Sequence, residues 1–180
     1  LFVDTLINNA GFGLNGEFAE QSPRQLQQMM QLNMLTLTEL TRLVVPSMRR
    51  NRRGRILNVA SIVAFQPCPR FAVYAATKAY VLSLSEALHS ELASDGIHVT
   101  ALCPGSTETE FHQVAQNEHA RLQRIPKDRA ADVAKAAYAA LNRNERTLVT
   151  GWINKPIPLM TRLTPKPVLL WAAARMAQRS

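Results

Sequence analysis

The chain has 180 residues, of which 47% are hydrophobic and 19% charged, a balance typical of one folded domain rather than of a disordered chain. No apolar run approaches the roughly 18 residues of a membrane span, and the first residues lack the basic start of a signal peptide. Cys68 and Cys103 lie far apart without metal-ligand spacing, which favours a reduced, cytoplasmic protein without a metal site. The net charge of +8 is densest in the run 49–55, which no aromatic residue interrupts. We therefore expect a basic loop there and no nucleic-acid partner.

Strand and helix patterns alternate along the chain. Strands are predicted at residues 5–9, 55–61, 97–103 and 146–150. Helices are predicted from Ser22, the N-cap, to residue 48, over 73–94 with Gly96 at the end, and over 129–141 with Asp128 as the cap. The strands are continuous apolar runs, which indicates a parallel sheet covered by helices on both faces. The predicted fold is therefore α/β, a Rossmann-like, doubly wound parallel sheet.

Ligands of such sheets bind beyond the carboxyl ends of the strands. Polar and glycine residues gather at those ends, in residues 8–11, at Ser61 and in residues 104–109. This alternating pattern occupies residues 1–151. Residues 152–180 are punctuated by four prolines and are predicted to form an amphipathic C-terminal tail of the same domain.

A GxGxxG motif at residues 11–16 follows the first strand. A dinucleotide fingerprint needs a helix that begins at its glycines, so that the helix N-terminus meets the pyrophosphate. Here the helix pattern begins only at Ser22 and Pro23. We therefore interpret the motif as a flexible turn after the strand and not as a pyrophosphate cradle.

The chemistry-bearing residues are Tyr74 and Lys78, which share one face of a helix because they stand at i and i+4. A phenol transfers protons poorly at neutral pH unless its phenolate is stabilised, and a cation within about 4–6 Å lowers its pKa. Ser61 ends the preceding strand, where its hydroxyl can bind the same substrate oxygen that Tyr74 protonates. The three residues together suggest acid–base catalysis on a carbonyl or an alcohol.

From Thr5 to about Thr150 the sequence resembles the classical short-chain dehydrogenase/reductase family, because that family's motifs occur here in the same order and at the same spacing. The matching positions are Asn8-Asn9-Ala10-Gly11, Asn33, Ser61, Tyr74-x-x-x-Lys78 and Pro104-Gly105-x-x-x-Thr109. The resemblance implies that Tyr74 is the general acid or base, that Ser61 orients the carbonyl, and that Lys78 holds the nicotinamide ribose and lowers the pKa of Tyr74. It implies that Asn33 holds a water in a proton relay; the alternative is a polar residue that kinks or caps within its helix.

The resemblance also implies a nicotinamide cofactor, NAD or NADP, with NADP slightly favoured. Its binding residues would be Asn9, Ala10, Gly11, Tyr74, Lys78, Pro104, Gly105, Thr107 and Thr109, with Thr107 acting through its backbone. The implied activity is hydride transfer between the nicotinamide and a small hydrophobic carbonyl compound or secondary alcohol. A homo-oligomer is implied through the helices at 26–48 and 73–94. An apolar stripe on the second helix supports it: Tyr80, Leu84, Leu88 and Leu92.

The family's first strand, its TGxxxGxG turn and the strand that selects NAD or NADP have no counterpart in the sequence. We therefore expect a fold truncated at its N-terminal strands, with residues 1–151 a partial catalytic domain and residues 5–9 an unpaired strand edge. For the chain as given we expect no measurable binding of NAD or NADP. The alternative to an enzyme is an inactive fragment or binding remnant. Membrane association through residues 152–180 is part of that alternative.

Overall fold

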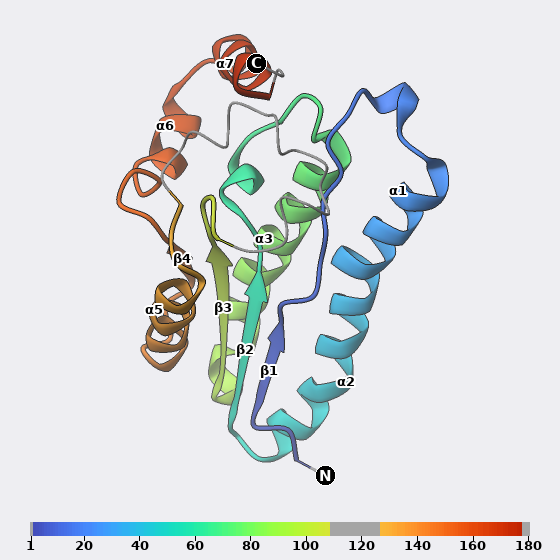
Figure 1. Ribbon diagram of the computed structural model, residues 1–180. Helices are drawn as coiled ribbons and strands as arrows, with labels where there is room; N and C mark the ends of the chain where they lie inside the picture. Colours follow the sequence, from blue (N-terminus) through green and yellow to red (C-terminus); the bar gives the residue numbers. More distant parts are fainter. Residues whose placement is uncertain (1, 109–126, 178–180) are drawn as a thin grey trace.

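A parallel four-stranded sheet in the order β1-β2-β3-β4 forms the centre of the molecule (Figure 1). The structure is a computed structural model that describes residues 2–108 and 127–177. The strands are β1 (Thr5–Asn8), β2 (Gly54–Val59), β3 (Ile97–Cys103) and β4 (Thr147–Val149). In the register, Ile56 of β2 stands between Leu6 of β1 and Val99 of β3. The predicted parallel α/β sheet is confirmed, with every strand bound within two residues of the expected one.

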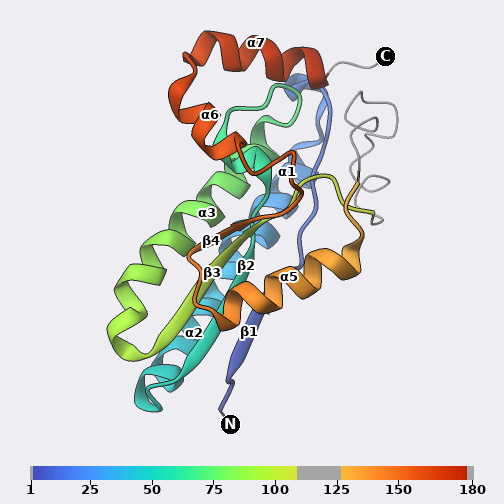
Figure 2. The same cartoon turned by 90° about the vertical axis from the view of Figure 1, so that its left-hand side faces the viewer.

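Helices cover both faces of the sheet. α2 (Leu37–Arg50) and α3 (Ala72–Leu92) lie on one face, and α5 (Ala130–Asn142) lies on the other (Figure 2). Ile56 packs in a cluster with residues of α2 and α3, whereas its neighbour Leu57 packs in a cluster with residues of α5. Successive side chains of a strand point to opposite faces, so β2 is buried on both sides. This double burial explains the continuous apolar strands and confirms the doubly wound arrangement.

The long helix expected after Ser22 is divided into three pieces, namely α1 (Pro23–Met30), the π-helical segment η2 (Gln31–Thr36) and α2. α1 has a proline in its first turn as predicted, and a short 3-10 helix, η1 (Phe18–Glu20), comes before it. The π-helical segment joins α1 to α2. Ser22 occupies the N-cap position, but its side chain makes no capping hydrogen bond. The π-helical segment surrounds Asn33, a residue singled out by the sequence.

Two helix boundaries were tested by the structure. α3 passes into the 3-10 helix η4 (Ala93–Asp95) and ends at Gly96 with φ of 73°, so the predicted glycine stop is confirmed. The prediction that Asp128 caps the next helix is wrong, because Arg129 is its N-cap. The backbone of Asp128 instead bonds to the segment after β3, its N–H donating to the Ser106 carbonyl and its own carbonyl accepting from the Glu108 N–H.

The tail forms two helices, α6 (Ile157–Leu163) and α7 (Lys166–Ala177). Both lie at the end of the molecule toward which the strands point (Figures 1 and 2). α6 contacts the 3-10 helix η3 (Ile62–Phe65), which follows β2. Across residues 2–108 and 127–177, none of the helices has both the length and the apolar character needed to cross a membrane.

The apolar stripe expected to form an oligomer contact on α3 is largely used inside the chain. Leu92 is buried, and Tyr80, Leu84 and Leu88 pack against core clusters. The Tyr80 hydroxyl also hydrogen-bonds the Thr38 hydroxyl of α2 at 2.8 Å. Three of the four side chains are therefore only partly buried, and the stripe offers less free surface for an oligomer contact than the sequence suggested. Of these two helices, α2 carries the more exposed apolar side chains, with Leu43 74% exposed.

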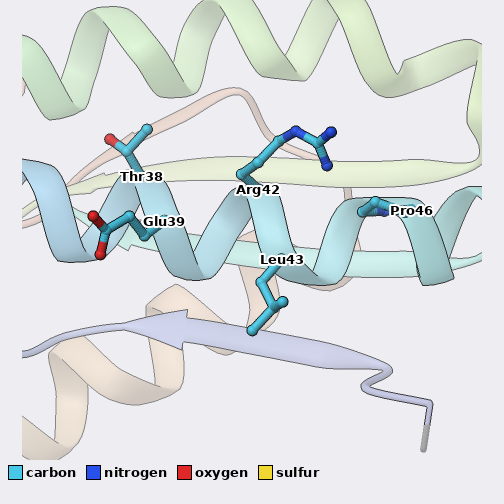
Figure 3. A pocket seen from close by; sticks show the side chains of 5 residues that line it. All are labelled: Thr38, Glu39, Arg42, Leu43 and Pro46. Carbon is cyan, nitrogen blue, oxygen red and sulfur yellow. The ribbon is translucent and has the colours of Figure 1, made fainter.

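A shallow groove runs along α2 beside this exposed leucine. Figure 3 shows Leu43 pointing to the side of β1 and Arg42 to the side of α3. The groove is lined by Thr38, Glu39, Arg42, Leu43 and Pro46. On β1, at the edge of the sheet, Ile7 is also more than half exposed.

Candidate active site

The carboxyl ends of β1, β2 and β3 bring three segments together at one edge of the sheet. Residues 9–11 follow β1, Ser61 follows β2, and Pro104 and Gly105 follow β3. Backbone hydrogen bonds continue the pairing beyond the strands: Ala60 N–H donates to the Leu102 carbonyl and Ile62 N–H to the Pro104 carbonyl. Because parallel strands end on the same side, residues far apart in sequence become neighbours here.

Ser61 is held rigidly at the start of η3. Its backbone is extended, and its hydroxyl oxygen accepts a hydrogen bond from the Val63 N–H at 3.3 Å. The same side chain hydrogen-bonds the hydroxyl of Tyr74, which projects from the first turn of α3. The predicted Ser61–Tyr74 pair is therefore present, and both side chains are more than nine-tenths buried.

Lys78 lies one turn after Tyr74 and is also buried. Its ammonium donates a 2.7 Å hydrogen bond to the Val59 carbonyl at the end of β2 and lies 5.8 Å from the centre of the Tyr74 ring. Burial lowers the pKa of Lys78 to about 8, an effect that the Cys103 thiol partly opposes. A lysine in this state carries a proton that it can exchange near neutral pH.

The pKa of Tyr74 differs from the expectation. Burial raises it above the ordinary value, the hydrogen bond to Ser61 opposes this rise, and Cys68 adds to it. The expected lowering by Lys78 is not found, because the ammonium is directed at the Val59 carbonyl and over the phenol ring. Tyr74 is therefore a protonated phenol at neutral pH, with Ser61 as the group that eases loss of its proton.

Asn33 connects two parts of the site. Its side-chain oxygen accepts from the Phe12 N–H at 3.2 Å, and its amide nitrogen donates to the Phe12 carbonyl at 2.9 Å and the Thr77 hydroxyl at 3.1 Å. Asn33 is 1% exposed and lies within the π-helical segment η2. The distortion of the helix agrees with the alternative of a residue that disturbs its helix, and π-helical turns are frequent at functional sites. The water relay stays a prediction.

Thr77 is a site residue that the sequence reasoning missed. Its hydroxyl donates to the Tyr74 carbonyl at 2.7 Å while it accepts the hydrogen bond from Asn33. Asn33 is therefore linked to the turn of α3 that carries Tyr74. The signal was present in the sequence, because Thr77 directly precedes Lys78 and stands at i+3 from Tyr74.

The glycine motif has a different role from the expected flexible turn. Gly11 lies in a segment without regular secondary structure, and the next residue, Phe12, is hydrogen-bonded in both directions to Asn33. A Cβ at Gly11 would lie 2.9 Å from the Asn33 side-chain oxygen and 3.5 Å from the Lys78 ammonium. Glycine is needed here for a close approach. The first helix begins only at Pro23, as the sequence indicated.

The segment after β3 is supported by the tail. Thr107 donates from its hydroxyl to the Gly105 carbonyl at 3.2 Å and forms an isolated parallel bridge with Asp128. Asn154 is buried beneath this segment, so close to Gly105 that a Cβ there would meet its amide group. The sequence carried no signal for Asn154, whose neighbours are set by tertiary packing. Thr109, predicted to contact the nicotinamide, lies outside the described residues.

The residues present fit the nicotinamide and ribose end of a dinucleotide. Lys78 offers its ammonium beside the backbone of Gly11, where a side chain would fill the space. Asn9, Ala10 and Gly11 are exposed along the same edge, within reach of a ligand. The arrangement places a buried hydroxyl pair, Ser61 and Tyr74, next to a cation and an accessible backbone, which suits proton transfer to a bound oxygen.

Comparisons with known proteins agree with this geometry. The family model described as short chain dehydrogenase matches residues 2–120. A short-chain dehydrogenase from Sphingobium yanoikuyae, solved in complex with NADPH, is 30% identical with a TM-score of 0.79, covering 99% of this chain and 68% of that one. The ketoacyl reductase HetN of Nostoc sp. is 40% identical over 103 residues, 57% of this chain and 36% of HetN.

The 3-oxoacyl-[acyl-carrier-protein] reductase FabG of Vibrio cholerae is 31% identical over 153 residues, covering 83% of this chain and 63% of FabG. The chain therefore spans less than two thirds of the length of these two curated relatives.

Proposed function

This chain belongs to the short-chain dehydrogenase family, and on that premise we propose that it is the catalytic part of an NAD(P)-dependent oxidoreductase. The reaction is hydride transfer between the nicotinamide and a carbonyl compound or secondary alcohol. The observation that carries the proposal is the buried hydrogen bond between Tyr74 and Ser61, with the Lys78 ammonium one helical turn away. The nicotinamide cofactor supplies or accepts the hydride when bound.

Tyr74 passes the proton in this reaction. It donates to the carbonyl oxygen during reduction and accepts from the alcohol during oxidation. Burial raises the pKa of Tyr74, which keeps the phenol at neutral pH in the protonated form that donates during reduction. Ser61 orients the oxygen and stabilises the negative charge that develops on it. Asn33 holds the segment after β1 against α3 and takes part in the proton path from Lys78.

Asn9, Ala10 and Gly11 would line the cofactor, Lys78 would hold its ribose, and the segment from Pro104 to Thr107 would hold its nicotinamide. The exposed backbone of residues 9–11 and the close approach of Gly11 to Lys78 support this position. Solved relatives include an NADPH complex and an NADH complex, which supports a nicotinamide cofactor without separating NADP from NAD.

The substrate is a small hydrophobic carbonyl compound. Apolar side chains surround the Tyr74 ring: Leu14, Met29, Cys68, Phe71 and Ala75 share its buried cluster. The names of two relatives, a ketoacyl reductase and a 3-oxoacyl-[acyl-carrier-protein] reductase, also describe reduction of a ketone. We place the protein in the cytoplasm, supported by its two free cysteines.

The test is consumption of NADPH with a panel of hydrophobic ketones, measured for the whole protein and for variants Tyr74→Phe and Tyr80→Phe. Tyr80 lies on the same helix, and its hydroxyl contacts Thr38 rather than Ser61, so Tyr80→Phe is the matched control. Loss of turnover in Tyr74→Phe alone would support the proposal. Equal activity in the two variants, or no activity with any ketone or alcohol, would contradict it.

A homo-oligomer is the proposed assembly, with the exposed face of α2 as its contact. Leu40 and Leu43 are 42% and 74% exposed there, and Leu43 lines the groove of Figure 3. Light scattering at micromolar concentration measures the mass directly. The expected result is a dimer or larger species that dissociates in Leu43→Glu, whereas a monomeric wild type would contradict the assembly.

A further inference from the structure

The tail carries an exposed apolar surface that the proposed reaction does not use. We call it the tail surface. It consists of eight large apolar side chains that are each at least 40% exposed: Trp152, Ile153, Leu159, Met160, Leu163, Val168, Leu170 and Trp171. Trp152 and Leu163 are 82% and 76% exposed. Isolated exposed hydrophobic side chains are ordinary, but a run of eight within twenty residues indicates an interaction surface.

The charge of the same segment has one sign. Residues 152–177 contain four basic residues and no acidic residue: Lys155, Arg162, Lys166 and Arg175. Elsewhere seven described arginines pair with carboxylates, as Arg49 does with Asp95 at 2.6 Å and Arg53 with Asp4 at 2.7 Å. Among the described residues, none of the four tail cations forms an ion pair.

The two tryptophans reinforce this pattern. They are the only tryptophans of the chain, and both lie in the tail surface. Arg175 lies over the Trp171 ring at 4.4 Å, so a cation and an aromatic ring are presented together. Tryptophan is enriched at the boundary between the hydrocarbon and the water of a bilayer, and long cationic side chains reach the headgroups beside it.

We propose that the tail surface docks on the surface of an anionic phospholipid bilayer, with the helices lying in the interface. Apolar side chains would enter the headgroup boundary, and the four cations would bind lipid phosphates and carboxylates. A second copy of the chain fits this surface poorly, because a symmetric contact would bring the cations of both copies together. The described helices are too short or too polar to span a bilayer, which leaves a peripheral mode.

Docking in this way would orient the molecule. α6 and α7 lie at the end toward which the strands point (Figures 1 and 2), and α6 contacts η3, the element that begins directly after Ser61. The edge of the sheet that carries Ser61 and Tyr74 would therefore face the lipid. A hydrophobic compound dissolved in the bilayer would have a short path to that edge.

The experiment uses the intrinsic fluorescence of the chain, because both tryptophans report on the tail surface alone. The chain is titrated with vesicles of phosphatidylcholine and with vesicles that contain about one third phosphatidylglycerol. The expected result is a blue shift and co-sedimentation with the anionic vesicles, and at least tenfold weaker binding to the neutral ones. Lipids brominated near the headgroup should quench the emission.

Two charge-reversal variants test the surface itself. Arg162→Glu/Lys166→Glu reverses two exposed tail cations, and Arg50→Glu/Lys135→Glu is the control with the same change in net charge away from the tail. The tail variant should bind anionic vesicles at least about 25-fold more weakly, since each of the two cations at such a surface contributes roughly fivefold. The control should change much less.

Three outcomes would overturn the proposal: no binding to anionic vesicles, equal loss in the two variants, or a blue shift that depends on protein concentration without lipid. The last would identify a second copy as the occupant. Circular dichroism of each variant shows that the fold is kept. None of these readouts depends on cofactor or turnover, so the proposed reaction and this surface fail independently.

Discussion

The site at the carboxyl edge and the tail surface differ in which groups are buried and which are paired. At the site, Asn33 and Lys78 are buried and each is hydrogen-bonded to backbone or side chain. In the tail, large apolar side chains face outward and the cations have no carboxylate partner among the described residues. Because buried polar groups must be hydrogen-bonded, contacts within the chain fix the positions of the side chains at the site. The tail, by contrast, presents side chains whose partners we expect outside the chain.

The largest expected effect is the loss of kcat when the proton donor of the site is removed. In a preparation with measurable reductase activity, Tyr74→Phe should lower kcat by about 10²–10⁴-fold, because only the phenol oxygen can pass the proton. Cofactor affinity should stay near the wild-type value, as the ribose contact is assigned to Lys78. Steady-state kinetics and a binding titration measure the two quantities. Retention of a tenth of the wild-type kcat would refute the assignment.

The second prediction concerns Lys78 and pH. Its pKa is lowered from 10.5 to about 8 by burial, so between these values the unfolded chain binds a proton that the folded protein does not. Stability attributable to Lys78 should therefore rise as pH increases from about 8 to about 10.5, by roughly 3 kcal/mol. Below pH 8 the cost of burying the charge is fully present.

Urea unfolding of wild type and Lys78→Met at several pH values isolates this contribution. The two cysteines and Tyr74 have raised pKa values, which lower stability at high pH in both proteins. Taking the difference between the two proteins removes Cys68 and Tyr74, while the smaller interaction of Cys103 with Lys78 stays in the difference. A difference that stays constant with pH would show that Lys78 is not desolvated in the folded protein.

The third prediction tests the close approach at Gly11. Gly11→Ala should destabilise the fold by about 1–3 kcal/mol, because the new methyl group would press on the Asn33 side chain. Gly16→Ala is the matched control, since a Cβ there would meet only the flexible Gln21 side chain at 3.7 Å. That control should be neutral or slightly stabilising. If both alanine variants unfold at the same urea concentration, the Gly11 contact is not close.

The smallest expected effect lies in the tail. Leu163→Gln should change the free energy of unfolding by less than about 0.5 kcal/mol, because its side chain is 76% exposed. Leu57→Gln, at a buried position of β2, should destabilise by several times more. Chemical denaturation of the two variants measures the contrast. A large loss of stability in Leu163→Gln would mean that the tail surface is part of the core.

The sequence alone predicted most of the sheet and its chemistry. Continuous apolar runs identified the parallel strands, because strands buried on both faces exclude polar residues. The i, i+4 spacing placed Tyr74 and Lys78 on one helix face, and Gly96 marked the end of that helix. These patterns are local, because each depends on the residues of one strand or helix and on how far that element is exposed to solvent.

Tertiary structure decided what depends on contacts between distant segments. Asp128 has the residue type of a helix cap, but its backbone pairs with the segment after β3 and Arg129 takes that position. The direction of the Lys78 ammonium toward Val59, and with it the pKa of Tyr74, follows from where β2 ends beside α3. Asn154 and Thr77 acquire their partners only when the chain is folded. Sequence spacing carries information about neighbours along an element, whereas hydrogen-bond partners across elements are chosen by packing.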